Sequence, residues 1–134
     1  MMVQELLKSQ SKSVIVYPPS RIDPSAQIGD GTKIGAFCDV GKNVVIGREC
    51  NIQAHVTISN GCRIGNKVFI GPNTSLLNDM FMDGHIQPVV VEDEARIGGG
   101  VTVRPSVTIG YKSTVACGVT VLKDVQPLTE WYGK

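Results

Sequence analysis

Residues suited to acid–base chemistry are concentrated in one short stretch of the sequence. The chain has two histidines, His55 and His85. His85 lies in segment 77–88, which also holds Asn78, Asp79 and a run of three large apolar residues at 80–82. An imidazole is an effective general base near neutral pH when it can reach the proton of the nucleophile. Segment 77–88 is therefore either a catalytic loop with His85 as its base or a polar turn with a hydrophobic plug.

The elements that must position this segment follow from a six-residue repeat. Aliphatic residues recur every six positions from Ile22 to Leu76 and again from Val91 to Val121, and each except Leu76 is followed four places later by a small or β-branched residue. This period fits neither a helix nor a long amphipathic strand, but suits a short strand followed by a tight turn. Val and Ile together number 30 against 6 Leu, a mix typical of short strands. The pattern predicts an all-β solenoid with an aliphatic interior.

The repeat is interrupted once. Fifteen residues separate Leu76 from Val91, where twelve or eighteen would keep the period. Solenoids place insertions on their surface, and loops held by a rigid scaffold commonly carry function. We therefore expect one loop excursion near residues 77–90, projecting from a single domain that comprises residues 1–134.

The repeat resembles that of the hexapeptide-repeat acyltransferases, and the resemblance covers residues 14–125. It implies a left-handed parallel β-helix of triangular cross-section, with three hexads per coil and about five coils. The stretch 68–73 followed by 77–79 is similar to the N-acetyltransferases that act on nucleotide-linked amino sugars. In those relatives an asparagine contacts the sugar near the reacting amine, and Asn78 takes this role by position, with Asp79 beside it.

A second branch with the same repeat, the galactoside and maltose acetyltransferases, uses a histidine of the excursion as general base toward a sugar hydroxyl. His85 is the best imidazole for that task here. His55 occupies the fourth place of its hexad, where side chains leave the core near a corner, and is interpreted as a substrate-binding or merely solvated residue. The γ-class carbonic anhydrases need three histidines around zinc, so two histidines disfavour a metal site.

A groove for a thin cofactor is indicated by small residues that stack. With three hexads per coil, Gly99 and Cys117 are eighteen residues apart and should lie on successive coils. Narrow corners with exposed backbone amides suit the pantetheine arm of coenzyme A. The resemblance adds that the Gly99 N–H donates to the thioester oxygen, and that Leu122 and Lys123 match a segment that binds the adenosine phosphate end. We expect Gly99, Cys117 and Lys123 to face the same side.

The remaining cysteines and the two ends of the chain are interpreted as structural. Cys38, Cys50 and Cys62 lie twelve residues apart, which puts them on different faces and favours small core residues over a disulfide or metal role. At the ends we expect a helical turn or two within 2–8, a first strand within 14–17, and aromatic cover of the last coil. That cover would come from Trp131 and Tyr132.

These observations together predict an acyl-CoA-dependent acyltransferase. By resemblance it N-acetylates an amino group of a nucleotide-linked amino sugar, uses acetyl-CoA as co-substrate without a metal, and forms a homotrimer. The alternatives are a sugar O-acetyltransferase with His85 as base and a non-catalytic β-helix used for assembly. A net charge of +1 argues against nucleic acid or an anionic membrane as partner, and we expect a cytoplasmic protein.

Overall fold

The computed structural model describes residues 13–133, and the helical turn predicted within 2–8 lies outside this range. The described residues form strands of two residues each and no helix. The strands are β1 (Ile15–Val16), β2 (Arg21–Ile22), β3 (Gln27–Ile28), β4 (Lys33–Ile34), β5 (Asp39–Val40), β6 (Val45–Ile46), β7 (Asn51–Ile52), β8 (Thr57–Ile58), β9 (Arg63–Ile64), β10 (Phe69–Ile70), β11 (Ser75–Leu76), β12 (Val90–Val91), β13 (Arg96–Ile97), β14 (Thr102–Val103), β15 (Thr108–Ile109), β16 (Thr114–Val115), β17 (Thr120–Val121) and β18 (Glu130–Trp131).

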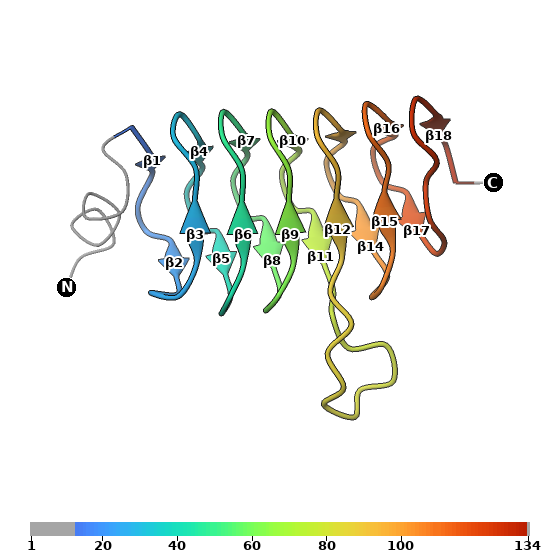
Figure 1. Cartoon of the computed structure of the whole chain (residues 1–134), viewed down its shortest axis with the longest axis horizontal. Coiled ribbons are helices and arrows are strands. Elements are labelled where there is room, and N and C mark those ends of the chain that lie inside the picture. Colours follow the sequence, from blue (N-terminus) through green and yellow to red (C-terminus); the bar gives the residue numbers. More distant parts are fainter. Residues whose placement is uncertain (1–12, 134) are drawn as a thin grey trace.

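The strands build three parallel sheets that form the sides of a solenoid (Figure 1). Sheet A has the order β1-β4-β7-β10-β13-β16-β18, sheet B the order β17-β14-β11-β8-β5-β2, and sheet C the order β15-β12-β9-β6-β3. The chain visits the sheets in turn and winds with the left hand expected from the resemblance (Figure 1). Three strands per coil give about six turns, one more than predicted, because β1 and β18 extend the coil beyond the regular repeat.

The excursion lies between β11 and β12 and projects away from the coils (Figure 1). Stacked strands are normally eighteen residues apart, as in the pairing of Ile52 with Ile70. Across the excursion the separation is 27, as in the pairing of Ile70 with Ile97. Nine residues are therefore inserted without loss of register, and the predicted loop is confirmed.

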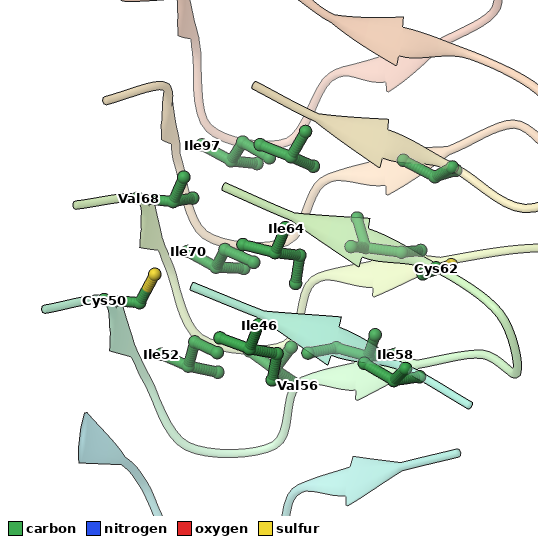
Figure 2. Packing of buried hydrophobic residues seen from close by; sticks show 14 of the residues in the cluster. Ile46, Cys50, Ile52, Val56, Ile58, Cys62, Ile64, Val68, Ile70 and Ile97 are labelled. Carbon is green, nitrogen blue, oxygen red and sulfur yellow. The ribbon is translucent and has the colours of Figure 1, made fainter. Parts of the chain in front are cut away.

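The core is a ladder of aliphatic side chains. In nearly every strand the first residue is exposed or half-buried and the second is buried, so the aliphatic residues of the repeat stack inside the coil (Figure 2). Cys38, Cys50 and Cys62 are buried, unpaired in disulfides, and precede strands of three different sheets, as predicted. Burial raises the pKa of each of these thiols, and that of Cys62 reaches about 11. They are core residues whose thiols are not accessible to solvent.

Glycine follows many of the aliphatic residues because the next coil leaves no room for a side chain, and not because the backbone there is left-handed. A tight turn predicts a left-handed backbone there, yet Gly35 has no positive φ. A Cβ at Gly35 would instead lie 2.6 Å from the backbone N of Ala54 in the next coil, which leaves no room for a side chain. The left-handed positions come two places later and are often not glycine, as at Phe37 and His55, both with φ 61°.

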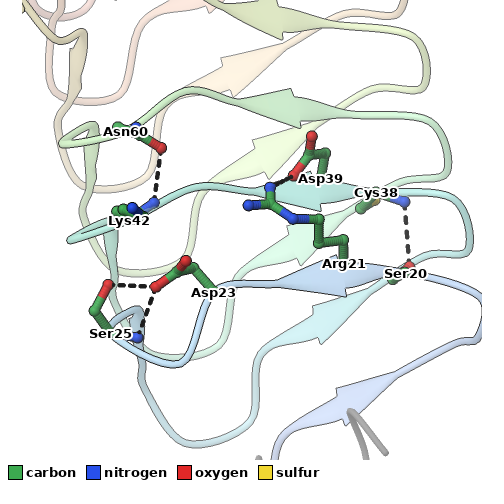
Figure 3. A network of polar contacts seen from close by, with 8 residues as sticks. All are labelled: Ser20, Arg21, Asp23, Ser25, Cys38, Asp39, Lys42 and Asn60. Carbon is green, nitrogen blue, oxygen red and sulfur yellow. Dashed lines mark hydrogen bonds and ion pairs between the residues drawn. The ribbon is translucent and has the colours of Figure 1, made fainter.

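Polar side chains bind successive coils to one another at the corners. The Asn60 side-chain oxygen accepts from Lys42 N at 2.8 Å, and Cys38 N donates to Ser20 Oγ at 3.2 Å (Figure 3). On the outer face of sheet B the Arg21 guanidinium contacts Asp39 at 2.6 Å (Figure 3). The contacts of Asn60 and Ser20 satisfy turn amides that the short strands leave unpaired.

The two ends differ in how well the predictions fit. The first strand predicted within 14–17 is confirmed as β1, which pairs with β4. Trp131 lies in β18 and packs against the core, as expected. Tyr132 is 70% exposed and donates its hydroxyl to Glu130, so it does not cover the last coil.

Candidate functional site

The predicted site residues lie at the corners of the triangle. We call the turns that follow strands of sheet A corner AB; its turns are 17–20, 35–38, 53–56, 71–74, 98–101 and 116–119. The turns that follow strands of sheet B form corner BC, which comprises 23–26, 41–44, 59–62, the excursion 77–89, 104–107 and 122–125. The two corners lie at opposite ends of the strands of sheet B, so a residue's position within the repeat decides which corner it occupies.

Gly99 and Cys117 stack on corner AB, as their spacing predicts. Gly118 N donates to Gly99 O at 2.9 Å, and Gly100 N donates to the Pro72 carbonyl at 2.8 Å. Within residues 13–133 the Gly99 N–H has no hydrogen-bond acceptor. Cys117 is exposed. This part of corner AB therefore presents a free amide donor next to a small thiol on the following coil. Gly98, Gly99 and Gly100 add no side chains there.

A groove on the outer face of sheet A opens next to these residues. It has a volume of about 610 Å³, and its lining is more apolar than polar. Phe69 of β10 and Arg96 of β13 point outward there, and the groove reaches Gly98 and Cys117 at the corner. Phe69 and Arg96 were missed by the sequence analysis. The available signal was an aromatic residue at an outward position, where the neighbouring coils carry Asn51 and Arg96.

Leu122 and Lys123 lie on corner BC, not on corner AB. The Lys123 ammonium lies 5.2 Å from the centroid of the Trp131 ring, and the Leu122 carbonyl accepts from Arg104 Nη1 at 3.3 Å. A groove of about 510 Å³ lies there, between the Lys123 turn and Met80 of the excursion. Gly99 and Lys123 therefore do not face the same side of one chain, and the single groove expected from the sequence is wrong in this respect.

The excursion also belongs to corner BC. Asn78 Nδ2 donates to the Asn60 carbonyl at 3.0 Å, which fixes the start of the loop on the neighbouring coil. Asp79 accepts from Asp83 N at 3.1 Å and from Gly84 N at 2.8 Å, and these bonds hold the pKa of its carboxyl below the ordinary value, the Gly84 bond most of all. Asp79 thus shapes the loop. The structure gives Asp79 this role, whereas the resemblance predicts a contact with the substrate.

His85 extends from the excursion into solvent. Its side chain is 88% exposed, and Nδ1 lies 3.9 Å from an Asp83 carboxylate oxygen. Its backbone N donates to the same oxygen at 3.0 Å. Nothing within the described chain buries the imidazole, so it is free to meet a ligand or a second molecule.

His55 lies on corner AB, two coils before Gly99. Its ring is stacked on that of Phe37, with ring centroids 5.0 Å apart and an interplanar angle of 12°. Both side chains are exposed. Eighteen residues separate the two rings in the sequence, so this pair could have been found from the same spacing that joins Gly99 to Cys117.

The predicted site residues thus divide between two corners of one chain. Corner AB carries His55, Gly99 and Cys117, and corner BC carries Asn78, Asp79, His85, Leu122 and Lys123. Pro72 and Asn78, which lie on the two corners of one coil, are six positions apart, a length of chain that spans at most roughly 20 Å. No group of three metal-ligating side chains occurs among residues 13–133. That range also contains no helix long and apolar enough to cross a membrane.

Two family models match separate parts of this solenoid. The bacterial transferase hexapeptide (six repeats) matches residues 25–60, and the hexapeptide repeat of succinyl-transferase matches residues 88–123. The chain belongs to the hexapeptide-repeat family. No curated protein matches the sequence of this hexapeptide-repeat chain.

Solved structures of similar fold include several acyltransferases. A mutant of perosamine N-acetyltransferase from Caulobacter crescentus, in complex with CoA and GDP-perosamine, has 27% identity and a TM-score of 0.78 over 88% of this chain. A hexapeptide-repeat-containing acetyltransferase from Vibrio cholerae has 26% identity and a TM-score of 0.55, covering 95% of this chain and 72% of its own. The N-acyltransferase AntD from Bacillus cereus, with dTDP and 3-hydroxybutyryl-CoA, has 22% identity and a TM-score of 0.78, covering 92% of this chain and 79% of its own. The chain spans about half, 53%, of the perosamine enzyme.

Proposed function

We propose that this chain is an acyl-CoA-dependent acyltransferase that N-acetylates an amino group of a nucleotide-linked amino sugar. The observation that carries the proposal is the stack of Gly99 on Cys117, with a free N–H and a groove beside it. It occurs on a fold shared with an N-acetyltransferase that binds CoA and GDP-perosamine.

In the proposed reaction the substrate amine attacks the thioester carbonyl of acetyl-CoA directly. The carbonyl oxygen gains negative charge as the tetrahedral intermediate forms, and the Gly99 N–H donates to it. The C–S bond then breaks, the thiolate of CoA leaves, and the acetyl group stays on nitrogen as an amide. The amine loses a proton to His85 or to water, and Asn78 orients the attacking nitrogen.

The division of these residues between two corners supports a site built from two copies of the chain. Gly99 donates from corner AB, whereas Asn78 and His85 lie on corner BC, so one chain does not bring them together. In a homotrimer with threefold symmetry, corner AB of each chain can face corner BC of the next. The excursion of one copy then brings Asn78 and the exposed His85 to the thioester held at Gly99 of its neighbour.

The same arrangement gives each end of coenzyme A a place in the proposal. The pantetheine amides pair with the free backbone groups of corner AB near Cys117, beside the apolar groove that contains Phe69. Leu122 and Lys123 come from corner BC of the neighbouring copy and meet the adenosine phosphate end. Arg104, whose guanidinium reaches the Leu122 carbonyl, adds a second cation to this corner.

The test is to incubate the chain with acetyl-CoA and a panel of nucleotide-linked amino sugars while free thiol is measured. Transfer to nitrogen predicts that Asn78→Ala lowers kcat/KM and that His85→Ala has a smaller effect. Transfer to a hydroxyl predicts the reverse order, because a protonated hydroxyl is a poor nucleophile without a base. Lys42→Ala, an exposed residue two coils earlier on the same corner as Asn78, is the matched control and should leave the rate unchanged.

An absence of acetyl-CoA binding would contradict both transfer reactions. In a calorimetric titration, no heat and no increase in Tm would leave a non-catalytic assembly role. Retention of full transfer in both the Asn78 and the His85 variants would remove these two residues from the mechanism while keeping the activity.

A further inference from the structure

The turns of corner AB change character along the solenoid. The left-handed position of successive turns is occupied by Phe37, His55, Asn73, Gly100 and Gly118. The two large rings are thus at the N-terminal end of this column, and the smallest residues are at the end where the acyl group is proposed to lie. Corner AB therefore presents an aromatic surface at its N-terminal end and a surface of small residues at its C-terminal end.

The Phe37 and His55 rings are stacked on each other and are both exposed to solvent. Phe37 is 57% exposed, and the His55 side chain is exposed as well. The rings are nearly parallel, 12° apart, and the next residue of the column is the shorter Asn73. The aromatic stack therefore ends at His55, whose ring has no further ring placed beyond it. Planar heterocycles stack favourably on such surfaces.

We propose that Phe37 and His55 form a stacking platform for the heterocyclic base of the nucleotide-linked acceptor. This inference rests on the proposed function and names the part of the protein that recognises the nucleotide. Phe37 packs on one face of the His55 ring, and the base lies against the other face, on the side of Asn73. The imidazole also offers a ring nitrogen that can hydrogen-bond to the sugar or phosphate.

The spacing along the solenoid limits the path that such a ligand can take. Coils stack at about 4.8 Å, so two coil steps from His55 to Gly100 amount to roughly 10 Å. Ribose, diphosphate and hexose are together longer than this when extended, so between a base at the platform and an amine at Gly99 they follow a bent path along the corner. Asn73 lies in this interval and presents an amide to the sugar or the diphosphate.

Coenzyme A also carries a heterocyclic base, but the position of the platform favours the acceptor. From Gly99 the exposed thiol of Cys117 lies one coil further toward the C-terminal end, and Lys123 lies in the turn after it on corner BC. The platform lies in the opposite direction. The adenine of CoA and the base of the acceptor therefore leave the reacting centre along opposite directions of the solenoid.

The experiment titrates the full chain with dTDP, with inorganic pyrophosphate and with acetyl-CoA, each by calorimetry. We expect dTDP to bind more tightly than pyrophosphate, because only dTDP carries a base. His55→Leu removes the flat ring that contacts the base and should raise the Kd for dTDP by about 5- to 150-fold. Phe37→Leu keeps apolar bulk but removes the ring behind His55, and it should raise the same Kd by a smaller factor. Phe37→Tyr should bind dTDP as the wild type does. Tyr111→Ala, which removes another exposed aromatic ring from a different corner, should also leave it unchanged.

Two results would overturn the platform. Equal affinities for dTDP and pyrophosphate would show that no base is recognised, and loss of acetyl-CoA binding in Phe37→Leu would show that the rings serve coenzyme A instead. Failure of the proposed function has a different signature. The wild type would then bind no acetyl-CoA at all, while the dependence of dTDP binding on Phe37 would persist.

Discussion

Cys117 should be the one thiol of the four that reacts in the folded protein, and acetyl-CoA should protect it. Cys38, Cys50 and Cys62 are each at most 3% exposed, and the pKa of all three is raised by burial. With a pKa of about 11, roughly one Cys62 thiol in a thousand is ionised at pH 8, and the thiolate is the reactive form. Burial of its side chain slows the reaction further.

The assay is alkylation with iodoacetamide at pH 8, with modified peptides counted by mass spectrometry. We expect one modified cysteine per chain under native conditions and four in guanidinium chloride. Saturating acetyl-CoA, which has no free thiol of its own, should slow modification of Cys117 at least tenfold, and Cys117→Ala should abolish the native signal. Rapid labelling of a second cysteine would contradict the buried ladder. Labelling of Cys117 at an unchanged rate with acetyl-CoA bound would refute its place beside the pantetheine.

The other predictions concern the core and the excursion. Ile58→Ala removes a fully buried rung of sheet B and should lower the free energy of unfolding by about 2–5 kcal/mol in denaturant titrations, whereas Thr57→Ala on the outer face of the same strand should change it by less than about 0.5 kcal/mol. Similar losses for the two variants would argue against the inward and outward assignment of β8. The Asp79 carboxylate has a lowered pKa in the folded loop, so its contribution is complete above the ordinary aspartate value of about 3.9 and is lost as the pH falls through the lowered value. The Gly84 amide resonance should therefore shift as the pH falls below about 4, and in Asp79→Asn this pH dependence should disappear; an unchanged shift in that variant would remove Asp79 as the acceptor.

The hexad spacing was sufficient to predict the coil, its core and the place of the excursion. Each aliphatic residue of the repeat is buried because a two-residue strand leaves only one inward position, and the sequence shows that position directly. The stacking of Gly99 on Cys117 follows from the same count. Lys123 is six residues beyond Cys117, and one hexad moves a residue to the next corner. The spacing therefore also predicts that Lys123 and Cys117 lie on different corners.

Other features of the site do not follow from a periodic pattern. The hydrogen bonds of Asp79 to Asp83 and Gly84 depend on the path of a loop that has no repeat. The role of the glycines also depends on three-dimensional packing, since the Cβ that Gly35 lacks would meet the next coil. The outward Phe69 becomes part of a groove only when Arg96 of β13 is placed beside it and Thr114 of β16 beyond that.

The central claim is that each site joins corner AB of one copy to corner BC of another, and mixed oligomers test it most directly. One partner carries Cys117→Trp, which fills corner AB, and the other carries Asn78→Ala with His85→Ala, which disables the excursion. Each variant alone should be inactive.

In trimers assembled from an equal mixture of the two variants, each interface has a chance of one half of receiving an intact corner AB and one half of receiving an intact corner BC. About a quarter of the sites should then be complete. We predict that the mixture, but neither variant alone, regains about a quarter of the wild-type rate of thiol release from acetyl-CoA. A mixed preparation that forms oligomers yet stays at background would place all the reacting groups within one chain and contradict the shared site.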